Sequence, residues 1–473
     1  LTVYFHPDTG DFYYGRIWFD TSDSLHEQHY TGVQGIGLSD EREIVVHIAN
    51  GPADTVDFHH TTLGDSSDYE SVYIHNLGTT ELEIYDITAT EPFYVNFSSD
   101  TLDTLENIEV EIRFYPSVSG EYFGTLNIFS NDSDEGEVAI PLYGFAEPLN
   151  NIYHVSTAGS DTSGNGTEAY PYATIQTAID AASDGASILI YEGVYHDDVN
   201  VDNKELTIGS KFMLDHGNLN YIDNTILDGQ DAHRLISGSH SNITLIGMTI
   251  INGYSDSYAG AIAMDMSELT INDCRFRENY AGVNGGVMNL NGTNLNIFNS
   301  DFYNNSSERA SVINVGNHTE TDRIINIRIN KSKFRSNIGQ GRGAINVWGS
   351  DTTSFIDCEF YDNVSGNYGG GFIVHHTNFL SIDSCNISNN TAINGTGGGL
   401  SLWDIGEGII SNSLISNNFI PDTAEYSYGG GISLWADTEI VIRNCTITNN
   451  SSNESSGIRI KHNSHCKIIN SII

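Results

Sequence analysis

The feature that most constrains this chain is a short motif that recurs at near-constant spacing through its second half. A typical copy has a small residue, an apolar residue two positions later and an asparagine three positions after that, and the first copy, at Met248, is divergent. The copies are Met248/Ile250/Gly253, Cys274/Phe276/Asn279, Ser300/Phe302/Asn305, Ser332/Phe334/Asn337, Cys358/Phe360/Asn363, Cys385/Ile387/Asn390, Ser413/Ile415/Asn418, Cys445/Ile447/Asn450 and an unfinished one at Ser471. The steps between them are 26, 26, 32, 26, 27, 28, 32 and 26 residues. Repeats of this length predict a solenoid, in which each repeat packs on its neighbours.

The repeats contain short strands rather than helices. Most copies carry a second apolar segment after a glycine pair, as in Gly370-Gly371-Phe372. Both segments alternate apolar and polar residues, which predicts strands with one buried face. No copy has the roughly ten helical residues that a crossover helix needs. A leucine-rich repeat is the alternative, but the core positions hold Ile, Val, Phe and Cys, which favours an all-β, right-handed parallel β-helix.

A parallel β-helix stacks its coils about 4.8 Å apart, so like positions form vertical files. We expect the Cys/Ser and Phe/Ile files inside. We expect the asparagine file at a turn, where Asn tolerates left-handed backbone and its amides hydrogen-bond from coil to coil. Two files are expected to point outward. In the first, positive and negative charges alternate from coil to coil: Arg275, Asp301, Lys333 and Glu359. In the second, a cation alternates with an aromatic ring: Arg277, Tyr303, Arg335 and Tyr361. Such contacts are mildly favourable, so we interpret these basic residues as structural.

The solenoid is predicted to span residues 152–473 and to begin with a helical cap. Residues 173–182 place Ile175, Ala178 and Ile179 on one helix face, ahead of a predicted strand at 187–191. A helix at this point covers the first strand edge of a solenoid, which otherwise invites aggregation. No such helix follows Ile473, so we expect that the C-terminal end is truncated and that the natural chain continues.

The first 150 residues contain a different repeat, with a period of 109 residues. The F-x-P motif at Phe5 returns at Phe114, and short β-branched and aromatic segments separated by turn residues lie between them. This spacing predicts immunoglobulin-like β-sandwiches of about 100 residues each. Residues 1–37 then form the C-terminal half of one sandwich, and residues 38–148 form a complete one.

The charge balance excludes some partners. The chain has 62 Asp and Glu against 19 Lys and Arg, a net charge of -43. So acidic a chain repels phosphate backbones and anionic membrane surfaces, so no nucleic acid is expected as a partner. No apolar run approaches the roughly 18 residues of a membrane span. The five cysteines form no C-x-x-C pair, and four share one repeat position, which predicts buried thiols rather than disulfides or a zinc site.

Two parts of the sequence resemble known families. The segment IYHVSTAGSDTSGNGTEAYPYATIQTAIDAA, which starts at Ile152, resembles the opening of secreted bacterial members of the pectin-lyase-like right-handed β-helix superfamily. The F-x-x-N and G-G-[AILV] pairs are similar to those of polymorphic outer-membrane autotransporters, which act as adhesins. The F-x-P, S-N-D and PLYGFAEP segments resemble Hydin-type immunoglobulin-like domains of bacterial surface proteins. These resemblances imply an extracellular or cell-surface location and a spacer or docking role for the sandwiches.

The main candidate site is a file of rings on the outside of the solenoid. Counting five residues from each glycine pair or its equivalent gives Trp348, His375, Trp403, Trp435 and Lys461. Strand alternation places these side chains outside and their neighbours inside. A row of exposed flat rings predicts a platform for sugar rings, which have apolar faces. The alternative is that an insertion at residues 419–428 covers Trp403 and Trp435.

A second candidate is a calcium site. Asp161 and Asn165 lie in the glycine-rich loop GSDTSGNGT and offer the oxygen ligands that calcium prefers. An ordinary turn is the alternative reading of this loop. No other cofactor is expected.

No catalytic residue is assigned from the sequence. Lyases and hydrolases of the β-helix superfamily need clustered carboxylates, with a base or a second acid on one face. Asp265, Asp404 and Asp437 are scattered, with no base predicted beside them in register. In the pair His375-His376 the side chains are expected to point to opposite faces, and His375 is expected to be a surface residue.

These observations favour a non-catalytic extracellular or cell-surface protein, adhesin-like, that binds glycans or partner proteins through the β-helix. The alternative is a carbohydrate-active enzyme, a polysaccharide lyase or glycoside hydrolase that acts on an extracellular polysaccharide. The acidic surface opposes this alternative where the substrate is a polyanion, because like charges repel. A purely structural spacer is the third interpretation.

Overall fold

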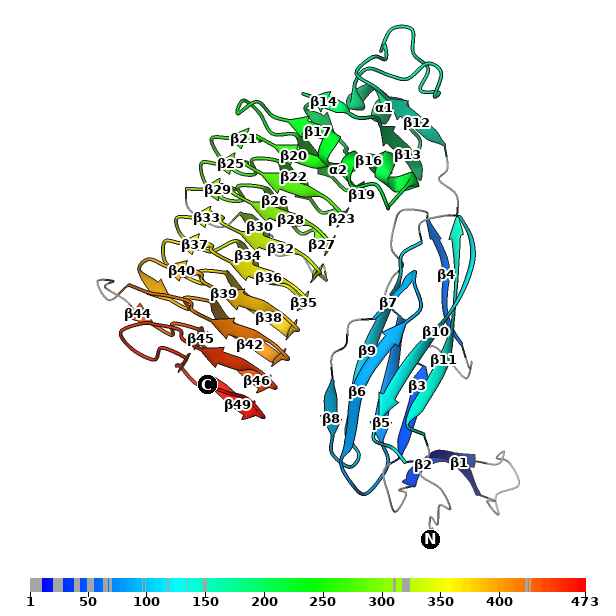
Figure 1. Ribbon diagram of the computed structural model, residues 1–473, viewed down its shortest axis with the longest axis vertical. Helices are drawn as coiled ribbons and strands as arrows, with labels where there is room; N and C mark the ends of the chain where they lie inside the picture. The colour runs from blue at the N-terminus through cyan, green and yellow to red at the C-terminus, as the bar shows by residue number, and fades with distance from the viewer. Residues whose placement is uncertain are drawn as a thin grey trace. The chain divides into compact units, whose positions relative to one another are not determined.

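The chain forms two compact units, Leu1–Pro148 and Leu149–Ile473 (Figure 1). The computed structural model describes residues 11–19, 29–37, 43–48, 55–62, 67, 70–95, 97, 99–116, 119–133, 135–147, 151–308, 312–316, 324–421, 424 and 427–473. None of the helices in these ranges is long and apolar enough to cross a membrane.

The first unit contains an immunoglobulin-like β-sandwich, as predicted. One sheet has the order β4-β11-β10-β6-β8 and the other has the order β3-β5-β9-β7. The strands are β3 (Ile44–Ile48), β4 (Val56–Thr62), β5 (Glu70–Asn76), β6 (Leu82–Ala89), β7 (Phe93–Val95), β8 (Asp100–Leu102), β9 (Asn107–Phe114), β10 (Gly120–Ser130) and β11 (Glu137–Glu147). Their inward residues, such as Val72, Ile84 and Phe114, form one buried core. Alternation of apolar and polar residues along each strand places these side chains inside.

Two strands precede the sandwich. β1 (Asp11–Phe19) and β2 (His29–Gly37) pair antiparallel. The rest of residues 1–37 lies outside the described residues, so the half sandwich there stays a prediction.

The second unit is a parallel β-helix with up to four short strands per coil. The first strands are β15 (Val199–Asn200), β18 (Ile236–Ser239), β22 (Ile262–Asp265), β26 (Met288–Asn291), β30 (Ile313–Gly316), β34 (Ile345–Trp348), β38 (Phe372–Asp383), β42 (Leu400–Ser411), β45 (Ile432–Trp435) and β48 (Ile458–Ile460). The second strands are β12 (Ile152–Val155), β13 (Ala186–Ile190), β16 (Glu205–Ser210), β19 (Asn242–Ile246), β23 (Glu268–Asn272), β27 (Asn294–Phe298), β31 (Asn326–Asn330), β35 (Thr352–Ile356), β46 (Glu439–Arg443) and β49 (His465–Ile469). β38 and β42 run through both positions and join them into one sheet.

The third and fourth strands form separate sheets. The third strands are β14 (Gly193–Tyr195), β17 (Thr225–Asp228), β20 (Thr249–Ile251), β24 (Arg275–Arg277), β28 (Asp301–Tyr303), β32 (Lys333–Arg335), β36 (Glu359–Tyr361), β39 (Asn386–Ser388), β43 (Leu414–Ser416) and β47 (Thr446–Thr448). The fourth are β21 (Tyr254–Ser255), β25 (Tyr280–Ala281), β29 (Ser306–Ser307), β33 (Ile338–Gly339), β37 (Val364–Ser365) and β40 (Thr391–Ala392), with β41 (Gly395–Thr396) beside β44 (Ser427–Tyr428).

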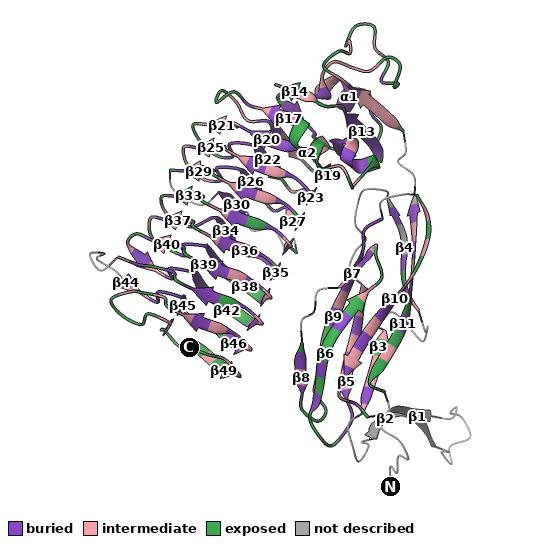
Figure 2. Cartoon of the chain, in the orientation of Figure 1, coloured by how far each residue is buried: buried purple, intermediate pink, exposed green. Residues whose placement is uncertain are grey.

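Like positions of successive coils lie in vertical files, as predicted. Phe276, Phe302, Phe334 and Phe360 stack inside with ring centroids 4.8, 4.7 and 4.9 Å apart. The four repeat cysteines are buried free thiols, as expected, and burial raises the pKa of the Cys274 thiol to about 12. Figure 2 shows buried residues along the strands of every coil. The interior is therefore a continuous apolar column.

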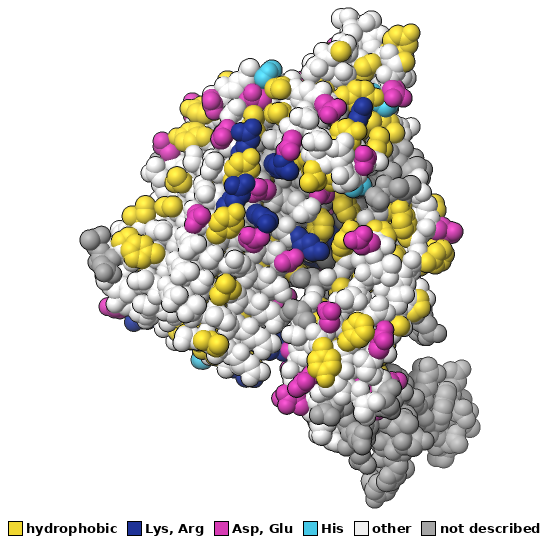
Figure 3. All heavy atoms as spheres, viewed as in Figure 1, with side chains coloured by type: hydrophobic (Ala, Val, Ile, Leu, Met, Phe, Trp, Pro, Cys, Tyr) yellow, Lys and Arg dark blue, Asp and Glu magenta, His cyan; other side chains and the backbone are white. Residues whose placement is uncertain are grey.

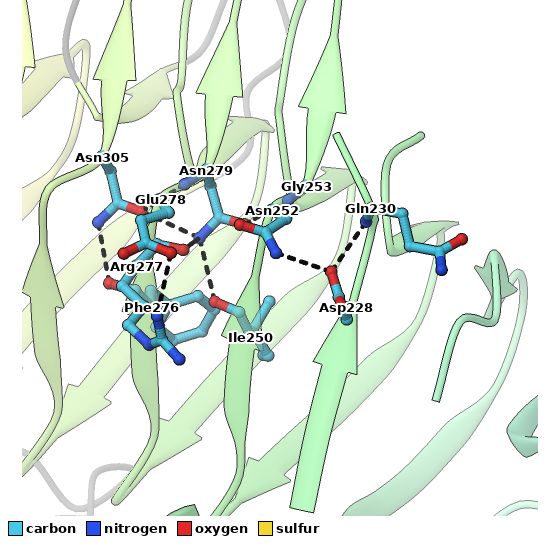
Figure 4. A network of polar contacts seen from close by, with 10 residues as sticks. All are labelled: Asp228, Gln230, Ile250, Asn252, Gly253, Phe276, Arg277, Glu278, Asn279 and Asn305. Carbon is cyan, nitrogen blue, oxygen red and sulfur yellow. Dashed lines mark hydrogen bonds and ion pairs between the residues drawn. The ribbon is translucent and has the colours of Figure 1, made fainter. Parts of the chain in front are cut away.

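The asparagine file forms a side-chain ladder (Figure 4). Asn305 is typical: its Oδ1 accepts from the backbone N–H and the amide of Asn279, at 3.0 and 2.9 Å. Its own Nδ2 donates to the carbonyl of Phe276 at 2.9 Å and to Oδ1 of Asn337 at 3.1 Å. The same pattern continues through Asn363, Asn390, Asn418 and Asn450. These buried polar atoms are therefore satisfied from coil to coil.

The left-handed backbone lies one residue before the predicted position. Glu278, Asn304 and Ser336 have φ of 59°, 56° and 54°, whereas the ladder asparagines that follow them are not left-handed. The expectation that the asparagine itself takes this conformation is therefore wrong. The preceding residue turns the chain, and the asparagine keeps its amide directed at the next coil.

The outward charges pair between coils, and Figure 3 shows Lys and Arg interleaved with acidic and hydrophobic side chains on one face. Lys333 and Glu359 are 2.7 Å apart, and Arg335 binds Asp301 through two nitrogens. The Arg335 guanidinium also lies 4.0 Å from the Tyr303 ring centroid. These cations have structural contacts, as predicted, but two of the partners differ: Arg275 pairs with Asp223 rather than with Asp301, and Arg277 pairs with Glu278.

The predicted helical cap is present as α1 (Ile175–Ala181), with Ile175, Ala178 and Ile179 buried. Two shorter helical turns, η1 (Lys211–Leu214) and α2 (Asn220–Asn224), follow it. Thr174 is the N-cap of α1, and Asp161 supports this end of the helix by binding Thr174 and Ala173. Its Oδ1 accepts from the N–H of Ala173 and of Thr174 at 2.8 and 3.1 Å, and its Oδ2 accepts from the Thr174 hydroxyl at 2.8 Å. A carboxylate is favourable at this end of a helix because of the helix dipole.

We predict that Asn337→Ala destabilises the solenoid by about 2–4 kcal/mol, because it removes the side-chain acceptor of the buried Asn305 backbone N–H, one of the two acceptors of the Asn305 amide, and the side-chain donor to the Phe302 carbonyl. Urea unfolding followed by circular dichroism measures the change. The exposed Asn378 provides the control, since Asn378→Ala should cost under about 0.5 kcal/mol. Equal effects of the two substitutions would contradict a stabilising ladder.

We predict that Asp161→Asn lowers stability at pH 7 by about 0.5–1 kcal/mol. Desolvation alone would raise the pKa of Asp161, but hydrogen bonds from Thr174 and Ala173 outweigh it and lower the pKa. A lowered folded-state pKa means that the carboxylate stabilises the fold above its unfolded pKa of about 3.9, and that this contribution is lost as the pH falls through the folded value. Thermal melts at several pH values should therefore show the gap between wild type and variant closing on acidification. A gap that widens in acid would contradict this supporting role of Asp161.

Candidate functional site

The predicted file of rings is present at the fourth position of four strands, which is the end of β34 and β45 and lies inside the longer β38 and β42. The parallel register pairs Trp348 with His375, His375 with Trp403, and Trp403 with Trp435. The residues that precede them, such as Val347 and Leu434, are buried in the core. Alternation along a strand therefore directs the four rings away from the core.

The file is less exposed than predicted. Trp348, Trp403 and Trp435 are partly exposed, but His375 is only 2% exposed, so the expectation of a surface His375 is wrong. Its Nε2 lies 2.7 Å from Oδ1 of Asn346, and its ring centroid lies 4.3 Å from that of Trp348. Contact with these two residues of the preceding coil buries the imidazole.

Asn346 belongs to a second asparagine ladder, one coil before His375. Its amide donates to Oδ1 of Asn314 at 2.6 Å, and the amide of Asn314 donates to Oδ1 of Asn289 at 2.8 Å. Sequence reasoning missed this ladder, although a signal was present: Asn289 lies three residues after Gly286 of the pair Gly285-Gly286, and Asn346 lies three residues after Gly343. It fixes the position of the His375 ring from below.

A His–Asp pair lies beside the file. His376 Nδ1 and Asp404 Oδ2 are 2.6 Å apart, with side chains 41% and 49% exposed. The expectation that no base lies beside Asp404 is therefore wrong. Both residues are left-handed, with φ of 55°, and form a corner inside β38 and β42, between the first-strand and second-strand positions of the coil. Strand alternation does not apply at such a corner. The sequence nevertheless held a signal, because the register that pairs His375 with Trp403 also places His376 beside Asp404 when it is extended by one residue.

This pair has the geometry of a general base. A carboxylate that accepts from Nδ1 favours the imidazole tautomer with its free lone pair on Nε2. The His376 ring centroid is 4.8 Å from that of Trp348, so a ligand on this indole lies within reach of the imidazole. The arrangement can bind a sugar hydroxyl or accept a proton from one.

The C-terminal end of the file is richer in cations. Trp435 lies 5.8 Å from Trp403 and 4.1 Å from His462 between ring centroids. The Arg459 guanidinium lies 4.9 Å from the Trp435 centroid and 4.2 Å from that of Tyr428, the last residue of the 419–428 insertion. The insertion thus reaches Trp435 through Arg459, while both indoles stay partly exposed.

Asp161 and Asn165 do not point to a cation. The Asp161 oxygens accept from residues at the start of α1, and Oδ1 of Asn165 accepts from the N–H and hydroxyl of Thr167 at 3.2 and 2.7 Å. Within the described part of the chain, no group of three or more His, Cys, Asp or Glu side chains is arranged to hold a metal ion. The geometry favours the turn over the calcium site.

Comparisons with known proteins bear on the fold. Residues 319–473 match the family model of the right handed beta helix region, and no curated protein matches the chain. The chain is similar to a Yersinia enterocolitica family 28 exopolygalacturonase, with 11% identity over 85% of this chain and 96% of that chain and a TM-score of 0.31. It is similar to the catalytic domain of a GH87 alpha-1,3-glucanase, with 10% identity, coverage of 92% and 96%, and a TM-score of 0.32. A PapD-like domain of human CEP192 is similar with 15% identity, coverage of 28% and 100%, and a TM-score of 0.19. The family match and the strand topology agree on a right-handed parallel β-helix in the second unit, and the two sheets of the first unit form an immunoglobulin-like β-sandwich.

Proposed function

We propose that the solenoid binds carbohydrate along the file of Trp348, His375, Trp403 and Trp435. In this proposal the protein is a non-catalytic, adhesin-like module, secreted or at the cell surface, whose partner is a polysaccharide or a glycan on another surface. The observation that supports it is the pairing in register of two partly exposed indoles, Trp403 and Trp435, whose ring centroids lie 5.8 Å apart in adjacent coils with their planes tilted by 54°.

The spacing of the coils suits an extended saccharide. A chain that runs along the solenoid axis meets a new coil about every 4.8 Å, so successive sugar rings can contact successive side chains of the file. Indoles offer a large apolar face at low entropic cost, and the nearby His376 and Asp404 offer hydrogen bonds to hydroxyls. Several weak contacts on one ligand then add up to useful affinity.

The location and the role of the sandwich rest on the resemblances. Modules of this kind, placed in series before a solenoid, serve as spacers that present a binding surface. The charge of -43 supports a setting in which salt screens the repulsion among carboxylates.

We predict that Trp403→Ala with Trp435→Ala weakens binding of a neutral glycan about 10-fold or more, because the platform of two indoles is lost. A glycan array identifies ligands, and titration calorimetry measures the affinity. Phe123→Ala serves as the control, since Phe123 is 73% exposed but lies on the sandwich. Unchanged affinity of a correctly folded double variant would remove the file from consideration.

A carbohydrate-active enzyme is the second candidate, and the His376–Asp404 pair beside Trp348 favours it. A fixed imidazole with a free Nε2 can act as a general base in lyase or hydrolase chemistry.

We predict that acidic and neutral polysaccharides incubated with the protein yield no new reducing ends and no unsaturated products. Chromatography of the products, with absorbance for unsaturated sugars, measures this. Products that form with the wild type and disappear with both His376→Asn and Asp404→Asn would establish the enzyme instead. Trp403→Ala is the matched control, because it alters binding and leaves the base in place.

A further inference from the structure

Arg459 differs from the ion-paired cations of the solenoid. Arg275, Lys333 and Arg335 each face a carboxylate. Arg459 is 8% exposed, and its Nη1 is buried without a hydrogen-bond partner among the described residues. Burial lowers its pKa, with Tyr428 and Glu454 acting in the opposite direction, but a guanidinium keeps its charge. The result is a buried cation with an unfilled donor.

A second unfilled donor lies in the adjacent coil. The register places Ser433 directly beside Arg459, and Ser433 is fully buried. Its hydroxyl also has no partner among the described residues. A buried donor without an acceptor costs about 1–3 kcal/mol, so such groups are nearly always satisfied in proteins. Two of them in adjacent coils point to a shared acceptor from outside the chain.

The rings around Arg459 leave its hydrogen-bonding edge available. Tyr428 and Trp435 lie 4.2 and 4.9 Å from the guanidinium and pack against it as cation–π partners. Stacking uses the faces of a planar guanidinium and leaves its N–H edge for an oxyanion. The exposed Lys461 follows at the next position of the file, which adds a second positive charge at the Trp435 end.

We propose that the Trp435 end of the file is a subsite for an anionic sugar substituent, a carboxylate or a sulfate ester, that accepts hydrogen bonds from Arg459 and Ser433 while the sugar ring packs on Trp435. This rests on the proposed function and adds the class of saccharide. Because Arg459 is 8% exposed and its Nη1 is buried, binding of the anion to Nη1 requires the side chains around the guanidinium to rearrange. In so acidic a chain, selection of the anion depends on these short-range hydrogen bonds rather than on long-range attraction.

Two pairs of oligosaccharides test the subsite: oligogalacturonate against its full methyl ester, and chondroitin sulfate against desulfated chondroitin. Titration calorimetry at fixed ionic strength should show one charged form binding about 10-fold tighter than its partner. The first pair reports a carboxylate and the second a sulfate ester. Arg459→Gln should remove this advantage without changing affinity for the neutral form. Arg459→Lys should keep part of it, and Arg277→Gln, an equal charge change on another sheet, should keep all of it.

Three results would contradict the proposed subsite: equal affinity for the charged and neutral forms, no binding of any of the four oligosaccharides, or a preference for the charged form that persists in Arg459→Gln. An ordered water would then be the shared acceptor. Trp403→Ala, measured on the same oligosaccharides and on the array ligands, reports separately on the platform. An affinity that Trp403→Ala does not change contradicts the proposed function. An affinity that Trp403→Ala lowers, but that is equal for charged and neutral forms, contradicts the subsite alone. Circular dichroism melts confirm that each variant is folded.

Discussion

The structure of the solenoid depends on hydrogen bonds that run between coils. Backbone pairing alone sets the spacing, but the asparagine ladder fixes the register, because each Oδ1 takes two donors from the preceding coil. A shift of one residue would leave these buried groups unpaired at about 1–3 kcal/mol each. The same ladder tolerates insertions, because coils of 26 and of 32 residues both place their asparagine in it.

This register has consequences for every side chain outside the core. Like residues lie about 4.8 Å apart, so two stacked carboxylates repel and an acidic chain must avoid them. Here an acid in one coil often meets an amide in the next. Asn291 donates to Asp265, and Asn299 donates to Asp273. In another file, Lys333 pairs with Glu359 of the next coil, so opposite charges rather than two carboxylates lie one above the other. The net charge of -43 is thereby carried without disruption of the files.

The candidate site lies on the first strand of the coil and the corner that follows it, away from the asparagine ladder of the F-x-x-N motif. The corner after the first strand is left-handed at His376 and at Asp404, which turns both side chains out beside the rings. The two lines of side chains, rings on the strand and polar groups at the corner, lie parallel to the solenoid axis. The proposed carbohydrate binding would use both lines, because an extended ligand along the axis can contact each of them.

The sequence by itself determined the fold and the files. Repeat spacing and alternation predict which residues stack, and this held for the phenylalanines, the asparagines and the pairing of Trp403 with Trp435. Those predictions depend only on position within a repeat. The burial of His375, the His376–Asp404 pair and the unfilled donors of Arg459 and Ser433 were decided by the tertiary structure. They depend on corner geometry and on side chains of adjacent coils, such as Asn346 and Tyr428. The physical reason is that backbone hydrogen bonds enforce register from the sequence pattern, whereas exposure and polar pairing follow from how neighbouring side chains fill space.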